Sequence, residues 1–314
     1  MRLRAATGVL VAALASGGAA QAGLFGHCAP PPPQSAAQHD RQLRFAAVIK
    51  AELEASGQPL AIVARSGLDL ARLGQRYSHA GFALRANAAA PWAVRQLYYD
   101  CDERRPRVFD QGLPGFVLGL DDAERGHVVA LLLPTQAAAA LERAVLDDRR
   151  AVALLAPTYS ANAYAFGLQY QNCNQWVVEM LAAAWAGLSG GDEARADADA
   201  TATGGTSARA EAQAWLHTRA YRPTQFDIAA QPWLWFALAL PWLHVDDHPQ
   251  ADVQAGTLHV SMPASIETFV RTAMPGAVRL EFCRAGTQVV TRRGGEPLPA
   301  DCRAADGDTV SSID

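Results

Sequence analysis

The sequence predicts an α+β fold in which an antiparallel sheet packs on a helix that begins at a cysteine. Three observations support this prediction. Apolar residues recur at helical spacing after Cys173. Two short apolar segments, 77–84 and 92–99, precede that helix with a turn-rich interval between them, which favours an antiparallel hairpin. The C-terminal part alternates turn residues with short apolar runs, which is typical of a small β-rich extension.

Residues 1–40 are expected to precede the folded domain. Two arginines and an apolar run lead to the small-residue sequence Ala20-Gln21-Ala22, which is typical of a secretory signal peptide, residues 1–22, that is cleaved after Ala22. Residues 23–40 contain four consecutive prolines and are expected to form an extended lead-in. We therefore expect a periplasmic or secreted protein that has no transmembrane span after cleavage.

The main domain is expected at residues 41–188, where apolar periodicity and turn residues delimit each element. Gly57 ends its first helix, and the hairpin follows a strand and a short connection. In chain order, the sequence predicts a helix at 41–56, strands at 59–65, 77–84, 92–99, 107–110 and 127–133, a helix at 137–148, and the helix that starts near Cys173.

The rest of the chain is expected to add an insertion and an extension. Residues 189–210 are dominated by Gly, Ala, Asp and Thr, which predicts a flexible insertion. Residues 211–314 are expected to hold a helical segment and the β-rich extension. The tryptophan-rich stretch 232–245 is too short to cross a bilayer, which needs about 20 residues, so we interpret it as a core helix rather than a membrane-surface helix.

Five cysteines in an exported protein leave at least one unpaired, because disulfides use them two at a time. Cys283 and Cys302 lie close together in the strand-like tail and are the easiest to pair. Cys28 with Cys101 would then be the second disulfide, and Cys173 would be the free thiol. The sequence does not prove this connectivity, so the pairing is a hypothesis.

Composition excludes several other classes of function. The net charge of −4 is near balance and gives no reason to expect nucleic acid. No phosphate loop, zinc motif or nucleotide fingerprint is present, so no cofactor is expected. His244, Asp246, Asp247 and His248 carry possible metal-ligand atoms, but adjacent residues rarely converge on one ion. We expect a polar cap there and no metal site.

Cys173 is the candidate nucleophile. Asn172 is a good N-cap, which places Cys173 on the first turn of its helix. The unpaired N–H groups and the helix dipole there favour a thiolate, and they can also hold a developing oxyanion. Two alternatives stay open: Cys173 is a small buried core residue, or it is half of a disulfide.

His79 is the candidate base, because it is embedded in a predicted strand between aromatic residues and glycine. Gly81 would leave space for a substrate backbone. A third polar group is expected on the paired strand, where it would orient the imidazole; we choose Gln96, with Tyr98 and Asp100 as the next choices. The alternative for His79 is a structural role.

Two motifs together resemble a known family. Tyr77-Ser78-His79-Ala80-Gly81, followed by Asn172-Cys173-Asn174-Gln175-Trp176, is similar to the circularly permuted branch of the NlpC-type, papain-like cysteine hydrolases. With Phe109-Asp110-Gln111-Gly112 and the segment 159–164 included, the run looks most like a bacterial family known as domain of unknown function 2145. This resemblance covers roughly residues 41–188.

The resemblance implies a permuted papain-like core with Cys173 as nucleophile, His79 as base and Gln96 as the match to the third polar position. The candidate substrate-cleft residues are Asn172, Asn174, Tyr77, Gly81 and Asp110. Gln175-Trp176 departs from the His-Phe of many members and leaves no second histidine beside the cysteine, which disfavours an acyltransferase.

The expected function is therefore that of a secreted cysteine hydrolase acting on an amide or ester bond. Exported relatives of this fold suggest a cell-wall peptide or a lipid-linked acyl group as substrate, by analogy. The alternative is a non-catalytic module that keeps the fold and binds a partner of the cell envelope.

Overall fold

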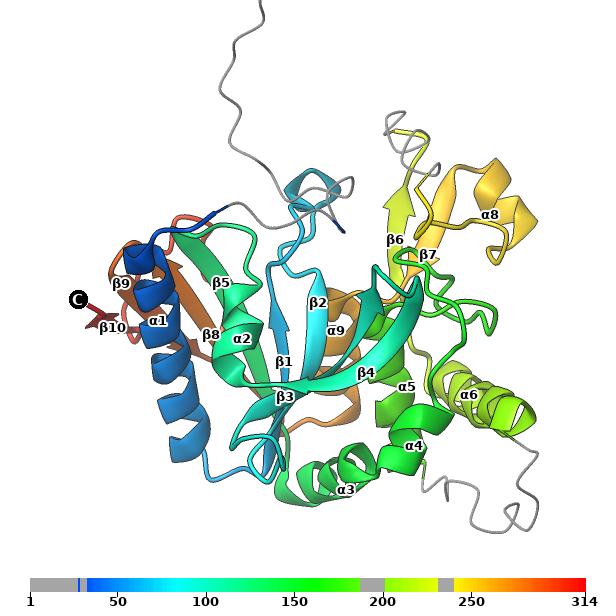
Figure 1. The fold of residues 1–314 in the computed structure, drawn as a ribbon, viewed down its shortest axis with the longest axis horizontal. Helices are drawn as coiled ribbons and strands as arrows, with labels where there is room; N and C mark the ends of the chain where they lie inside the picture. Colours follow the sequence, from blue (N-terminus) through cyan, green and yellow to red (C-terminus); the bar gives the residue numbers. More distant parts are fainter. Residues whose placement is uncertain (1–27, 29–32, 187–200, 231–239) are drawn as a thin grey trace, which may run out of the picture.

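The computed structural model describes residues 28, 33–186, 201–230 and 240–314 (Figure 1). Within these ranges, helices flank one large sheet, and a small two-stranded sheet lies beside it. The elements are α1 Ala36–Ala55, β1 Leu60–Arg65, the 3-10 turn η2 Ala71–Leu73, β2 His79–Leu84, β3 Ala93–Asp100, β4 Arg105–Gln111, α2 Leu113–Leu118, β5 Arg125–Leu132, α3 Thr135–Leu146, α4 Asp148–Ala153, α5 Cys173–Trp185, α6 Thr201–Thr218, β6 Thr224–Asp227, α8 Gln250–Gln254, β7 Thr257–Val260, α9 Pro263–Ala273, β8 Val278–Ala285, β9 Gln288–Arg293 and β10 Thr309–Ser312.

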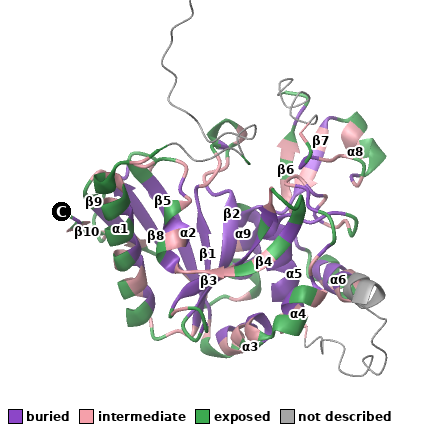
Figure 2. Cartoon of the chain, viewed as in Figure 1, coloured by how far each residue is buried: buried purple, intermediate pink, exposed green. Residues whose placement is uncertain are grey.

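The large sheet has eight strands in the order β10-β9-β8-β5-β1-β2-β3-β4. All its neighbouring strands pair antiparallel. Every residue of β1 and β2 is buried, and both strands are coloured as buried along their whole length in Figure 2. A strand buried on both faces reads as a continuous apolar run, as the sequence does here. The predicted α+β class with an antiparallel sheet is therefore confirmed.

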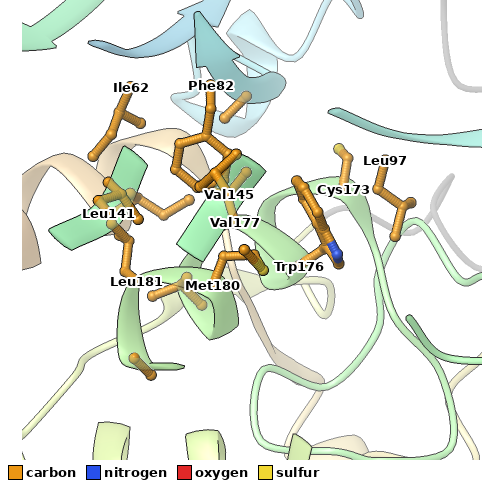
Figure 3. Close-up of a cluster of buried hydrophobic side chains, with 14 of the residues drawn as sticks. Ile62, Phe82, Leu97, Leu141, Val145, Cys173, Trp176, Val177, Met180 and Leu181 are labelled. Carbon is orange, nitrogen blue, oxygen red and sulfur yellow. The ribbon is translucent and has the colours of Figure 1, made fainter. Parts of the chain in front are cut away.

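Alternate residues of the central strands enter two separate cores. Ile62 and Phe82 pack on the face covered by α5, α3 and α9. Val63 and Ala83 pack on the opposite face, which α1 and α2 cover. The division follows from the two-residue period of strand side chains. Figure 3 shows the first core, where side chains of α5 meet Phe82 of the sheet.

Helix α5 begins at Cys173, as its sequence predicts. The Asn172 side chain accepts a hydrogen bond from the Gln175 backbone N–H at 2.7 Å, which caps the helix. Residues 173–183 of the helix are all buried. Its one acidic residue, Glu179, is compensated by Arg209, whose Nε lies 2.9 Å from the carboxylate. Helix α5 is therefore held both by a local cap, Asn172, and by a tertiary ion pair with Arg209.

The predicted hairpin is formed by β2 and β3. Its register pairs Phe82 with Arg95, and Leu84 with Ala93. The β2–β3 ladder stops at Phe82, whereas β1 follows the other edge of β2 as far as His79. The first residues of β2 thus have no strand partner on the side of β3. This gap in the ladder lies where α5 begins.

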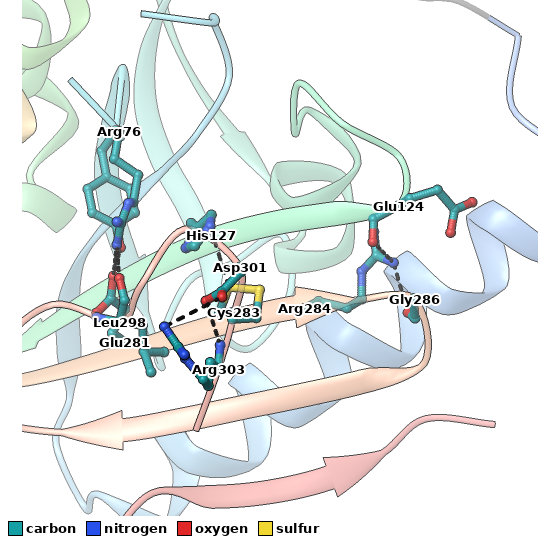
Figure 4. Close-up of a disulfide and its surroundings, with 12 residues drawn as sticks. Arg76, Glu124, His127, Glu281, Cys283, Arg284, Gly286, Leu298, Asp301 and Arg303 are labelled. Carbon is teal, nitrogen blue, oxygen red and sulfur yellow. Dashed lines mark hydrogen bonds and ion pairs between the residues drawn. A yellow bond between two sulfur atoms is a disulfide. The ribbon is translucent and has the colours of Figure 1, made fainter. Parts of the chain in front are cut away.

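The β-rich C-terminal part continues the central sheet. β8 pairs along the whole of β5, and β9 and β10 follow it, so these strands are not a separate extension. Without β8, β5 would be a buried edge with unpaired backbone groups. Figure 4 shows the Cys283–Cys302 disulfide in this region and the nearby ion pair between Arg76 and Glu281.

Both predicted disulfides are present. Cys28 is bonded to Cys101, Cys283 is bonded to Cys302, and Cys173 is free. The Cys28–Cys101 bond attaches the N-terminal segment to the end of β3. The observed pairing therefore agrees with the hypothesis drawn from the position of the cysteines.

Some expectations are changed by the structure, and others concern residues outside the described ranges. Helix α6 begins at Thr201, so the predicted insertion cannot extend to residue 210. Side chains of α6 such as Leu216 enter the core, which stabilises the helix despite its weak sequence pattern. The signal peptide at 1–22, residues 23–27 and 29–32 of the lead-in, residues 187–200 and residues 232–239 of the tryptophan-rich stretch lie outside the described residues. Residues 36–40, expected to be extended, instead form the first part of α1, which Ser35 caps. Among the described helices, none combines the length and apolar character that a membrane span requires.

Candidate functional site

Cys173 is buried at the start of α5, with 7% of its surface exposed. Its sulfur is hydrogen-bonded to the backbone N–H groups of Ala80 and Asn174. Asn174 also donates from Nδ2 to the carbonyl oxygen of Ser78 at 3.1 Å. The first turn of α5 therefore occupies the gap in the β2–β3 ladder, and the sulfur lies against the β2 backbone.

Burial determines the protonation of Cys173. It raises the pKa of the thiol to about 11, although the N–H groups of Ala80 and Asn174 and the charge of Arg65 act in the opposite direction. The expectation that the helix start favours a thiolate is therefore wrong for this closed site, because loss of hydration outweighs the helix terminus. At neutral pH the sulfur carries its proton.

His79 lies at the same end of β2 and is also buried. Its Nε2 is 2.6 Å from Gln96 Oε1, and Gln96 Nε2 donates to Gln111 Oε1 at 2.8 Å. With Gln96 in this orientation, its oxygen accepts the proton of Nε2, which leaves the lone pair of the neutral ring on Nδ1. Two amides thus fix the tautomer of the histidine.

Strand geometry brings Gln96 to His79. Along β2, Ala80 turns into the core under α5, and His79 turns to the side of α2, where its ring centroid is 6.1 Å from that of Phe116. When the register is extended from the last pair, Phe82 with Arg95, residue 96 falls opposite Gly81. It is then diagonal to His79 and on the same face of the sheet. The sulfur is hydrogen-bonded to the backbone N–H of Ala80, the residue that follows His79 in β2.

The alternatives to Gln96 have other contacts. Tyr98 packs edge-on against the His79 ring at 5.8 Å between centroids. Asp100 accepts hydrogen bonds from the N–H groups of Asp102 and Glu103 at 3.0 Å each and thereby closes the turn after β3. The direct partner of the imidazole is the residue that the sequence pattern favours.

The five predicted cleft residues divide into two groups. Asn172 and Asn174 lie at the start of α5, as a cap and as a neighbour of the sulfur. Tyr77 instead donates to Glu281 at 2.5 Å, and Asp110 pairs with Arg95 at 2.8 Å. A side chain on Gly81 would lie 2.7 Å from Val94 Cγ1, so its space is filled by β3 and is closed to substrate.

Gln111 is a contributor that the sequence argument missed. Asp110 was chosen beside it, but the pairing of Arg95 with Asp110 puts that carboxylate on the other face. Gln111 pairs with Val94 and so shares the face of Gln96. Strict alternation along β4 is the signal that would have found it.

The comparisons with known proteins identify a family. Residues 52–270 match the family model DUF2145, described as an uncharacterized protein conserved in bacteria. The chain belongs to this family. No curated protein matches the chain, and no solved structure matches it.

The DUF2145 match extends well beyond the region expected to resemble the family, residues 41–188. It includes β6, β7 and residues 263–270 of α9, which follow α5, and it ends before β8. The strands β6 and β7 contribute to a cavity of about 110 Å³ whose wall includes Cys173. The cavity was not predicted from the sequence, because its lining comes from segments far apart in the chain.

The residues considered as metal ligands have structural contacts. Asp247 accepts from the Tyr164 N–H at 2.8 Å, Asp246 accepts from the Tyr170 hydroxyl at 3.0 Å, and His248 Nε2 is 2.8 Å from Asn162 O. Among the described residues, the one group of possible ligand atoms close enough to share an ion is His127, Cys283 and Cys302. The sulfurs of Cys283 and Cys302 in this group are bonded to each other as a disulfide.

Proposed function

We propose that this protein is an exported thiol hydrolase with a circularly permuted papain-like site, in which Cys173 and His79 cleave an amide or ester bond. The observation that carries the proposal is the hydrogen bond from His79 Nε2 to the Gln96 amide beside an unpaired cysteine at a helix start. Papain-like enzymes use the same three kinds of group: a thiol, an imidazole and an amide that orients it.

His79 is suited to act as the base. Its Nδ1 is the ring nitrogen nearer to its own backbone, and the sulfur is hydrogen-bonded to the next peptide N–H, that of Ala80. In the reaction, Nδ1 takes the thiol proton as the sulfur adds to the carbonyl carbon. The raised pKa of Cys173 makes this base necessary, since the thiol does not ionise by itself near neutral pH.

The remaining steps use groups already at the helix start. The backbone N–H groups of Cys173 and Asn174 point toward the sulfur and can stabilise an oxyanion that forms there. The protonated imidazole then gives its proton to the departing amine or alcohol. Water attacks the resulting thioester, which releases the acid and restores the thiol.

The two disulfides support the expected location. Disulfides persist in oxidising compartments such as the bacterial periplasm, and they are rare in the cytosol. We propose that the protein works outside the cytoplasm, on a cell-wall peptide or a lipid-linked acyl group.

One observation favours the alternative, a non-catalytic module that binds an envelope partner. Burial holds the pKa of the Cys173 thiol at about 11, which is unlike the lowered values of many reactive cysteines. On this alternative, the thiol is a packing residue, and the cavity beside it binds a ligand without chemistry.

A thiol-reactive acyl probe separates the two functions. We expect labelling of Cys173 between about pH 5 and pH 9, with a rate at least tenfold lower in His79→Ala. His259→Ala is the matched control, because the imidazole of His259 also contacts a polar side chain, Asp252 at 3.2 Å, but lies outside the proposed dyad. His79→Gln provides a second variant of similar polarity, and thermal unfolding checks that each variant is folded.

The binding module would be favoured by an absence of labelling over this pH range in folded wild-type protein. Equal labelling rates in wild type and His79→Ala would also contradict the proposal, because the sulfur would then react without the base.

A further inference from the structure

The cavity beside Cys173 has walls from several parts of the chain. The connection between β1 and β2 contributes Leu70 and Leu73, the small β6–β7 sheet contributes Phe226 and Leu258, and the start of α5 contributes Cys173. Several of these residues also form an apolar cluster of their own, separate from the two cores of the large sheet. The nucleophile thus forms part of the wall of an apolar chamber.

The lining chemistry excludes recognition of charged groups. Among the described residues that line the cavity, none is an acid, a lysine, an arginine or a histidine. The polar side chains are mostly committed elsewhere: Ser78 Oγ accepts from the Leu68 N–H at 2.8 Å, and Asn162 Nδ2 donates to His244 O at 2.6 Å. A polar peptide side chain would lose its hydration here without replacement hydrogen bonds.

One buried acceptor beside the sulfur has no partner. Asn174 is 2% exposed and lines the cavity, and its Nδ2 is used by the Ser78 carbonyl. Its Oδ1 has no hydrogen-bond partner among the described residues. An unpaired buried acceptor is unfavourable, so a ligand with an N–H or O–H group at this end of the cavity would gain a hydrogen bond there.

We infer that the cavity holds the unbranched hydrocarbon part of an acyl group whose carbonyl reaches Cys173, with a donor on the head group facing Asn174. The substrate is then a lipid-type acyl ester or amide. Apolar walls favour a flexible hydrocarbon chain, because each methylene group buried against them is removed from water. This inference rests on the proposed thiol hydrolase activity and selects between its two substrate classes.

The reaction is balanced with water as the only co-reactant. A bond forms between Cys173 Sγ and the carbonyl carbon, the bond from that carbon to oxygen or nitrogen breaks, and the thiol proton goes through His79 to the leaving group. Hydrolysis of the thioester then releases the fatty acid and returns a proton to the sulfur.

A series of p-nitrophenyl esters tests the inference on the full chain. Acylation of Cys173 is followed by p-nitrophenol release and by the mass added to the protein. We expect the second-order rate constant to rise at least tenfold from the acetate to the decanoate ester, because the chain enters the cavity. An equal rate for all chain lengths would overturn the inference and leave the hydrolase standing.

Two variants at one position make the test independent of folding defects. Leu73 is half-buried in the cavity wall, so Leu73→Trp fills space and Leu73→Ala opens it. We expect the preferred chain length to shorten in the first and to lengthen in the second. Leu43→Trp on α1 is the control, since Leu43 is 44% exposed and lies outside the cavity.

A binding measurement separates failure of the inference from failure of the proposed function. 1-Decanol, which is uncharged and carries an O–H donor on an unbranched chain, is titrated into Cys173→Ser by calorimetry, which requires no chemistry. Saturable binding to Cys173→Ser, with a Kd at least tenfold higher in the double variant Cys173→Ser/Leu73→Trp, supports the cavity assignment. This holds even if no ester acylates the wild type. Absence of saturable binding overturns the assignment.

Discussion

His79, Gln96 and Gln111 form a chain of hydrogen bonds that determines which nitrogen of the imidazole carries the proton. Gln96 is 1% exposed, so neither the oxygen nor the nitrogen of its amide can freely exchange its partner for water. A histidine with a fixed tautomer is prepared to accept a proton at Nδ1. Gln96 is therefore a positioning residue, which acts through His79.

Gln96→Glu is expected to move the acid limb of the pH profile for Cys173 labelling to higher pH. A carboxylate at Oε1 stabilises the protonated imidazole, so the base becomes available only at higher pH. Gln96→Ala, which leaves Nε2 without its acceptor, is expected to lower the labelling rate about tenfold. A Gln96→Glu profile that superimposes on that of the wild type would show that the amide does not tune the base.

The thiol of Cys173 links stability to pH. The unfolded thiol loses its proton near the ordinary pKa of 9.0, and the folded thiol retains it up to about 11. Between these values the unfolded state binds fewer protons, so the stability contributed by Cys173 is present below pH 9 and is lost as the pH rises toward 11.

Between pH 8 and pH 10, we expect the free energy of unfolding of the wild type to fall by about 1 kcal/mol more than that of Cys173→Ser, as measured by urea unfolding. Because other buried groups such as Tyr221 also titrate at high pH, the difference between the two proteins is the relevant quantity. Parallel stability curves would mean that the sulfur is exposed to water.

At the scale of elements, the site depends on how closely β2 and β3 approach each other. Gly81 permits this approach, because a Cβ there would lie 2.9 Å from the Arg95 carbonyl oxygen and 3.1 Å from Gln96 Cβ. The glycine thus serves the partner of His79 rather than the substrate. The backbone pairing of the two strands stops at Phe82, and Ser78, just before β2, instead accepts a hydrogen bond from Asn174 on the first turn of α5.

Gly81→Ala is expected to destabilise the protein by about 2 kcal/mol and to displace β3 from β2. Because Gln96 moves with β3, the rate of Cys173 labelling should fall as well. Gly112→Ala is the matched control, since the nearest atom to its Cβ is 3.8 Å away and its φ is negative. An unchanged unfolding midpoint and labelling rate in Gly81→Ala would refute this account of the hairpin.

For the whole molecule, the two disulfides and the single thiol define its covalent state. The Cys28–Cys101 bond spans 73 residues, and the Cys283–Cys302 bond joins β8 to the segment before β10. The first closes a loop that contains α1, β1, β2 and β3, so its main effect is expected on the unfolded chain.

Thiol titration in denaturant is expected to find one reactive thiol per chain without reductant and five after reduction. The double variant Cys28→Ser/Cys101→Ser is expected to lower the free energy of unfolding by about 4 kcal/mol, as estimated from loop closure. Three or more thiols in unreduced protein purified from its oxidising compartment would contradict the assigned connectivity.

Local features of this protein were determined by its sequence. Asn172 followed by an apolar helical repeat predicted where α5 begins, and the odd number of cysteines with two nearby in the tail predicted the free thiol. The contact of Gln96 with His79 follows from the two-residue period of side chains on one face of a hairpin. These signals lie within a few residues or depend only on counting.

Tertiary structure alone decided what depends on distant segments. It pairs β8 with β5, and it brings cavity-lining residues together from segments before and after α5 in the chain. It also places β3 directly against Gly81. It also set the protonation of Cys173, because the helix start is a local property, whereas the loss of water around the sulfur requires the whole fold.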